Sequence, residues 1–121
     1  KLSTKWFNKW CKKMSLSSHE LLEAVNDLEN NLSTSNLGGG LYKIRVNSVN
    51  RGKSSAFRTI VVYKREDRVI FIYGFAKKVK SNLENSELQY LKKLGRDLLL
   101  MNADQLKQAV EIQILFDMEV Q

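Results

Sequence analysis

The sequence contains no proline, one cysteine and one histidine among its 121 residues. A single cysteine excludes an intramolecular disulfide, which suits a reducing compartment. One Cys and one His are also too few for a zinc site, which takes about four ligands, so we expect neither a metal ion nor a cofactor. Without proline there is no proline-rich linker to mark a boundary, and the length fits one domain. We therefore predict a single domain over residues 1–121.

Long apolar runs are absent as well. No stretch approaches the ~20 apolar residues that a membrane-spanning helix needs, and the lysine-bearing start lacks the apolar run of a signal peptide. The hydrophobic content of 43% is nevertheless ordinary for a globular protein. We expect a soluble, cytoplasmic protein with no membrane partner.

The lone cysteine and histidine superficially resemble a nucleophile with its base. Cys11, however, lies in an amphipathic stretch with aromatic neighbours, which is typical of a thiol buried in a core. His19 falls in the first turn of a predicted helix, where side chains are usually solvated. We interpret Cys11 as a core residue and His19 as a surface residue.

The charge is distributed unevenly, and the middle of the chain is strongly basic. Residues 1–13 carry five lysines and no acidic residue, whereas residues 14–42 carry four acidic residues and no Lys or Arg. Residues 43–80 then carry eleven Lys or Arg residues against two acidic ones. A basic segment of this kind attracts polyanions such as nucleic acids. The alternatives are that these residues only solubilise a sheet or dock an acidic partner.

Four segments show the apolar spacing or the capping residues of amphipathic helices. In the first, Trp6 and Trp10 are spaced four residues apart, and we assign this pair to the core. Ser17 and Glu20 form a capping box before the second. Gly95, inside the third, indicates close packing. The predicted helices cover residues 5–14, 17–30 and 85–101, followed by a short helix opened by Asn102.

Three strands are predicted between these helices, at residues 41–46, 57–64 and 69–75. We expect them to form an antiparallel meander, with a polar loop at 47–55 and the glycines at 38–40 acting as a hinge into the sheet. Residues 1–4 suit a short edge strand. The tail alternates over 112–120, which fits either an extra sheet strand or a segment that pairs with a partner.

Residues 37–78 combine a glycine run, a Lys-x-Arg strand, the segment Gly-Lys-Ser-Ser-Ala-Phe-Arg and the ending Tyr-Gly-Phe-Ala-Lys. This set resembles the RelE-like or HigB-like toxins of type II toxin–antitoxin systems, in the RelE/ParE/HigB superfamily. The resemblance covers most of residues 4–101, and residues 102–121 match only loosely. It implies an α+β fold with two N-terminal helices packed on a twisted antiparallel sheet, followed by C-terminal helices.

The same resemblance implies partners and an activity. It implies a cognate antitoxin of the helix-turn-helix type, contact with operator DNA only through the antitoxin complex, and messenger RNA on the ribosome as the target. The best-studied relatives cut messenger RNA within the ribosome, whereas others on the same fold poison DNA gyrase and cut nothing. The fold alone therefore does not decide the activity.

Cleavage of RNA without a metal uses the 2′-hydroxyl as nucleophile, so the enzyme must align the attack, stabilise charge on the phosphate and supply a proton. By resemblance, Arg58 and Lys78 match positions that contact the scissile phosphate, and Arg45 and Lys53 match RNA-contacting positions. Lys77 and Tyr73 join the first group because they lie close to Lys78 in the sequence, and Lys43 and Arg51 join the second because they lie two residues from Arg45 and Lys53. The full catalytic set is Arg58, Lys77, Lys78 and Tyr73, and the full RNA-binding set is Lys43, Arg45, Arg51 and Lys53.

The general acid is the weak point of this assignment. Relatives that cleave RNA often carry a Tyr or a His–Tyr pair beyond the basic residues, and residues 79–90 offer only Tyr90. Tyr73 is nearer, but strand alternation groups it with Phe71 and Phe75 and favours a place in the core. Two alternatives therefore stay open: a non-enzymatic toxin that binds and inhibits DNA gyrase, and an inactive domain bound by an antitoxin.

Overall fold

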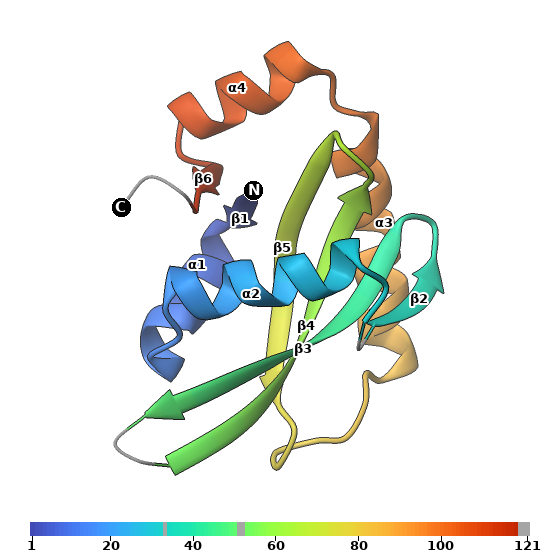
Figure 1. Ribbon diagram of the computed structural model, residues 1–121. Helices are drawn as coiled ribbons and strands as arrows, with labels where there is room; N and C mark the ends of the chain where they lie inside the picture. The colour runs from blue at the N-terminus through green and yellow to red at the C-terminus, as the bar shows by residue number, and fades with distance from the viewer. Residues whose placement is uncertain (33, 51–52, 119–121) are drawn as a thin grey trace.

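The structure, a computed structural model, describes residues 1–32, 34–50 and 53–118, and for residues 49–50 and 53–55 it describes the backbone alone. These residues form four helices and six strands (Figure 1). In chain order the elements are β1 (Leu2–Thr4), α1 (Lys5–Met14), α2 (Ser18–Glu29), β2 (Thr34–Gly38), β3 (Leu41–Asn50), β4 (Lys53–Lys64), β5 (Arg68–Ala76), α3 (Asn85–Leu100), α4 (Ala103–Glu111) and β6 (Leu115–Asp117). The α+β class predicted from the sequence is confirmed.

The strands form one sheet in the order β2-β3-β4-β5-β1-β6. The predicted meander is its centre, because β3, β4 and β5 pair antiparallel in sequence order. The sheet is mixed, however, since β1 lies parallel to β5. Residues 1–4 were predicted to form an edge strand, and this is wrong: β1 lies between β5 and the terminal strand β6.

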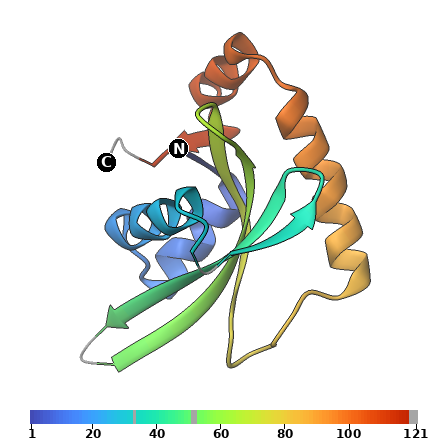
Figure 2. The same ribbon diagram turned by 45° about the vertical axis from the view of Figure 1, so that its right-hand side comes forward.

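The two faces of the sheet are covered by different helices. Figure 2 shows α1 and α2 on one side and α3 on the other, with α4 beyond the end of α3. On the first face, Phe7 of α1 and Val25 of α2 form a buried apolar cluster with Phe71 of β5. Leu91 and Leu98 of α3 pack on the second face, which we call the α3 face. The sheet is thus the middle layer between two apolar cores.

Local sequence signals position these helices. Ser17 and Glu20 form the predicted capping box, with the Glu20 N–H donating to Ser17 Oγ at 3.2 Å and the Ser17 N–H donating to Glu20 Oε1 at 3.0 Å. Gly95 confirms the predicted close packing, because a Cβ there would lie 2.6 Å from Leu41 Cδ1. Among the described residues, no helix is both long and apolar enough to cross a membrane.

Polar strands were the main error of the sequence-based secondary structure. Residues 47–55 were predicted to be a loop, but the β3–β4 hairpin continues through them as far as the pair Asn50 and Lys53. The strand β2 was not among the predicted strands, because its polar residues show no apolar alternation. Main-chain pairing alone makes both segments strands. The glycines at 38–40 all have positive φ and form the turn from β2 into β3, as expected of a hinge.

The tail forms a shorter strand than its alternation predicted. Among the described residues of the tail only Leu115–Asp117 is a strand, and it pairs antiparallel with β1 within the chain. Ile112 and Ile114 precede it and are 59% and 53% exposed. Residues 119–121 lie outside the described residues, so the end of the predicted strand is not tested.

A bulge in β5 decides which side chains reach the α3 face. Ile60 of β4 pairs with Tyr73, but the next residue, Val61, pairs with Phe71, so Ile72 is the extra residue. An extra residue shifts the alternation by one position. Phe71 therefore packs with α1 and α2, whereas Tyr73 packs on the α3 face. The predicted grouping of Tyr73 with Phe71 is wrong for this reason.

Candidate nucleic-acid interface

Three of the predicted basic residues come together on the α3 face. Lys43 and Arg45 lie two residues apart on β3, and Arg58 of β4 is the direct cross-strand partner of Arg45. All three line a cavity of about 390 Å³, together with residues of β2 and of the turn before it: Asn31, Thr34 and Ser35. We call Lys43, Arg45 and Arg58 the basic cluster. Strand geometry explains it, because alternate side chains of a strand project from the same face.

The basic cluster carries positive charge without a neutralising carboxylate. Among the described residues, no acidic side chain lines its cavity. Lys43 Nζ and Arg45 Nε donate to the neutral amide oxygens of Asn82 and Asn47, at 3.5 and 3.1 Å. Like charges directly opposite one another on neighbouring strands destabilise a sheet. The pair of Arg45 and Arg58 is therefore an arrangement that an anion would stabilise.

Arg58 has a side-chain N–H donor that makes no hydrogen bond among the described residues. This donor is Nη1, and it is buried. A buried donor without a partner costs about 1–3 kcal/mol, and a ligand that accepts from it removes that cost. The planar guanidinium fork matches a phosphate group in particular. A phosphate group would match both the positive charge and the spare donor of the basic cluster.

The remaining basic candidates are not gathered there by any described contact. Lys77 and Lys78 are exposed in the turn that follows β5, and no described hydrogen bond or ion pair joins either to Arg58. The backbone of Lys53 pairs with Asn50 in β4, but its side chain lies outside the description. Arg51 lies outside the described residues altogether. The structure therefore brings together three of the seven basic positions.

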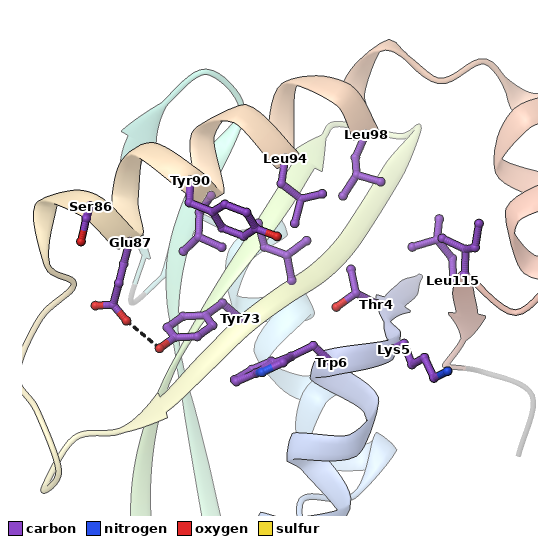
Figure 3. A pocket seen from close by; sticks show the side chains of 13 residues that line it. Thr4, Lys5, Trp6, Tyr73, Ser86, Glu87, Tyr90, Leu94, Leu98 and Leu115 are labelled. Atoms are coloured by element: carbon purple, nitrogen blue, oxygen red, sulfur yellow. Dashed lines mark hydrogen bonds between the residues drawn. The ribbon is translucent and has the colours of Figure 1, made fainter.

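Tyr73 belongs to a polar network that the sequence analysis missed. Its hydroxyl donates to Glu87 Oε2 at 2.7 Å, and Lys80 Nζ donates to both Glu87 oxygens at 2.6 Å. Lys80 Nζ also lies 5.5 Å from the centre of the Tyr73 ring. Figure 3 shows Tyr73 on the strand and Glu87 on the helix facing each other. The network ties the loop after β5 to the start of α3.

Each member of this network has a shifted pKa. The hydrogen bond from Lys80 lowers the pKa of Glu87 to about 2, aided by the N–H of Glu84 and by Tyr73. The hydrogen bond to Glu87 raises the pKa of Lys80. Burial raises the pKa of Tyr73, and its hydrogen bond to Glu87 raises it further. The Tyr73 hydroxyl therefore stays protonated and donates its hydrogen bond to the Glu87 carboxylate.

A sequence signal for Glu87 existed. The predicted helix began at residue 85, and the structure shows that its N-cap is Glu84. The residue three positions after the true cap is Glu87, and its Oε1 accepts from the Glu84 N–H at 2.9 Å. This spacing is that of a capping box. Its contact with Lys80 and Tyr73, however, depends on how α3 packs.

Trp6 was assigned to the core together with Trp10, and for Trp6 this is wrong. Trp10 packs beside Gly74, where a Cβ would collide with the indole ring. Trp6 is 48% exposed and stacks on Tyr73, with ring centres 4.8 Å apart. Tyr73 reaches Trp6 because the bulge in β5 places it on the α3 face.

The remaining candidates behave as structural residues. Cys11 is buried, and burial raises its pKa to about 12. His19 is exposed and lies 3.0 Å from Glu23 on the same helix. Both assignments made from the sequence are confirmed. Within the described part of the chain, no group of three or more His, Cys, Asp or Glu residues could hold a metal ion.

Comparison with known proteins gives one match. A family model described as the RelE toxin of the RelE/RelB toxin–antitoxin system matches residues 2–118. No curated protein and no solved structure gives a significant match. The matched range includes every element from β1 to β6 and all the residues of the basic cluster.

Proposed function

Since the chain belongs to the RelE family of toxins from toxin–antitoxin systems, we propose that it is a ribosome-dependent messenger RNA endoribonuclease that inhibits translation. Membership of the family makes the protein a toxin with a cognate antitoxin as its partner. The proposal adds the reaction and the target. It also places the protein in the cytoplasm, where ribosomes are found, and takes the antitoxin to be a helix-turn-helix protein that carries the complex to operator DNA.

The observation that carries this proposal is the basic cluster. Arg45 and Arg58 are direct cross-strand partners on β3 and β4. Among the described residues no carboxylate lines their cavity, and the buried Nη1 of Arg58 has no hydrogen-bond partner. A surface of this kind suits a phosphodiester, and it lies on a rigid sheet rather than on a loop. Pre-aligned cations at the phosphate stabilise the charge that develops during phosphoryl transfer.

The proposed chemistry needs no metal ion. The 2′-hydroxyl of the substrate attacks the adjacent phosphorus and loses its proton to water. The bond to the 5′-oxygen breaks, this oxygen takes up a proton from water, and a 2′,3′-cyclic phosphate remains on the upstream fragment. Arg58 pairs with the phosphate oxygens, Arg45 and Lys43 hold the neighbouring backbone, and the exposed Lys77 and Lys78 add positive charge at the end of β5. Lys53, whose backbone pairs with Asn50, and Arg51, which lies outside the described residues, complete the proposed RNA-binding set.

One observation favours a second candidate function. The Tyr73 hydroxyl donates a hydrogen bond to Glu87 and has a raised pKa, so it is poorly suited to protonate a leaving oxygen. A toxin without a general acid would act by binding, as a toxin that inhibits DNA gyrase does. On this alternative the basic cluster binds its target without cutting RNA.

Mapping transcript ends after controlled expression tests the proposal. New 5′ ends inside translated regions, in phase with codons, are expected within minutes of induction. Arg58→Ala should remove these ends and the growth arrest while the purified variant keeps its thermal unfolding midpoint. Arg65→Ala is the matched control, because it removes the same charge from the exposed turn at the other end of β4 and should stay toxic.

Three other outcomes are informative. Arg58→Ala that still produces the same ends would show that the site is wrong. Growth arrest with induced DNA damage and no new ends would favour the gyrase-binding alternative. Growth that continues normally in the absence of any antitoxin would point to an inactive domain.

A further inference from the structure

A row of aromatic rings runs along the α3 face away from the basic cluster. Phe75 is the cross-strand partner of Arg58. The Phe75 and Tyr73 ring centres are 6.3 Å apart, and Trp6 stacks on Tyr73 at 4.8 Å with an angle of 27° between the rings. We call Phe75, Tyr73 and Trp6 the aromatic row. It connects the proposed phosphate site to the start of α1.

The aromatic row ends at a groove of about 560 Å³ between α3 and the start of α1. Trp6 from α1 and Tyr90 from α3 project on opposite sides of this groove (Figure 3). They are 48% and 67% exposed, which is unusual for aromatic rings that lie over an apolar floor. The floor is formed largely by the leucines of α3 at positions 91, 94 and 98.

Positive charge lies at the rim of the groove as well. Lys5 lines it, and Lys80 Nζ lies 5.5 Å from the centre of the Tyr73 ring and 5.4 Å from that of Phe75. Among the described lining residues Glu87 is the one carboxylate, and it is already engaged by Lys80 and Tyr73. A phosphate backbone passing the rim therefore meets Lys5 and the Lys80–Glu87 ion pair rather than an unpaired carboxylate.

We propose that this groove binds a base of single-stranded RNA, stacked against Trp6 and Tyr90, next to the phosphate held by the basic cluster. This inference rests on the proposed function, because it takes RNA as the ligand of the basic cluster. Single-stranded nucleic acids are bound by cations that follow the backbone and by aromatic rings that stack on the bases. Here both occur on one sheet face, and the apolar floor suits the planar face of a base but no charged group.

The distances along β5 fit a continuous strand of RNA. Tyr73 and Phe75 lie two residues apart, which is roughly 7 Å along a strand. A phosphate at Arg58, beside Phe75, is therefore close enough to the groove for the same RNA strand to occupy both. The groove would then bind a base next to, or one removed from, the scissile phosphate.

Binding of two matched ligands tests the inference. One is a labelled single-stranded RNA of eight nucleotides, and the other is a ribose–phosphate strand of the same length without bases. The full chain should bind the RNA more tightly than the abasic strand. Trp6→Leu keeps an apolar side chain but removes the ring, and should weaken RNA binding about tenfold while leaving the abasic strand unaffected.

Two further variants keep the test independent of folding defects. Trp6→Phe retains a stacking ring and should keep most of the preference for the RNA. Tyr90→Leu alters the other side of the groove at an exposed position and should reduce the preference as Trp6→Leu does. Thermal unfolding of each variant shows whether the native fold is present during the measurement.

The inference and the proposed function fail in different ways. Equal binding of both strands by the full chain, or failure to bind either, would overturn the base site, and transcript mapping would judge the nuclease separately. Trp6→Leu that keeps RNA binding but loses neutralisation by an antitoxin would show that the groove docks a protein, which also overturns the inference. Cleavage absent from the cell despite a clear preference for bases would contradict the nuclease alone.

Discussion

The polar network at the start of α3 makes a quantitative prediction about stability and pH. Glu87 accepts hydrogen bonds from Lys80, Tyr73 and the N–H of Glu84, and its pKa falls from 4.5 to about 2. A carboxylate whose pKa is lowered on folding stabilises the protein above its unfolded pKa. That stabilisation is lost as the pH falls through the folded pKa, so the sensitive window lies between about pH 4.5 and pH 2.

The perturbation is Glu87→Gln, which keeps the shape of the side chain and removes the charge. The lowering of the Glu87 pKa on folding corresponds to about 3 kcal/mol of unfolding free energy if it is taken in full. The side chains of Glu87 and Lys80 are 25% and 28% exposed, so solvent screening reduces it, and we expect a loss of about 1–2 kcal/mol at pH 7. The urea midpoint should fall by roughly 1 M.

The assay is urea unfolding of both proteins at pH 7 and again near pH 2.5. The difference between them should shrink strongly at the lower pH, because the carboxylate is then protonated in the unfolded chain, so that folding has to release a proton before the network can form. Glu23→Gln is the matched control: its pair with His19 is exposed and should contribute less than about 0.5 kcal/mol. An equal urea midpoint at pH 7, or a difference that is the same at both pH values, would refute the reasoning.

Three other predictions follow from particular contacts. Arg45→Gln removes the like charge opposite Arg58 and should stabilise the fold by about 0.2–1 kcal/mol at low salt while weakening RNA binding. Urea unfolding at low and high salt checks the gain in stability, and an equal gain at both salt concentrations would contradict the prediction. Gly74→Ala places a methyl group against the Trp10 ring and should cost about 1–3 kcal/mol, measured by the urea midpoint; an unchanged midpoint would show that the ring moves freely. Cys11 has its pKa raised to about 12 by burial, so a thiol reagent at pH 8 should react at least about a hundredfold faster in urea than with the native protein, and equal rates would show that the thiol is accessible.

Much of the secondary structure could be predicted because its signals are local. The capping box at Ser17 and Glu20 and the leucine spacing of α3 act within one or two helical turns. The apolar runs of β4 and β5 likewise reflect burial on both faces of a covered sheet. Of the candidate site, the pairing of Lys43 and Arg45 on one face followed from strand alternation alone.

Other features depended on partners distant in the chain. The polar strand β2 has no apolar pattern of its own and exists because β3 offers it main-chain hydrogen bonds. The strand β1 lies inside the sheet because the tail returns to pair with it as β6. The alternation of the tail predicted a strand, but the choice of pairing partner leaves no mark in the local sequence, so no local pattern could reveal which strands pair.

The sequence by itself determined the class of the fold, the family, the helices and the basic character of the central strands, since these depend on residue type and short spacing. Only the tertiary structure decided which side chains meet. One extra residue in β5 moves Tyr73 to the face of α3, where it contacts Trp6 and Glu87. The pairing of β3 with β4 sets Arg45 against Arg58. Strand register and helix packing are set by many weak contacts summed over the whole chain, which is why single segments do not disclose them.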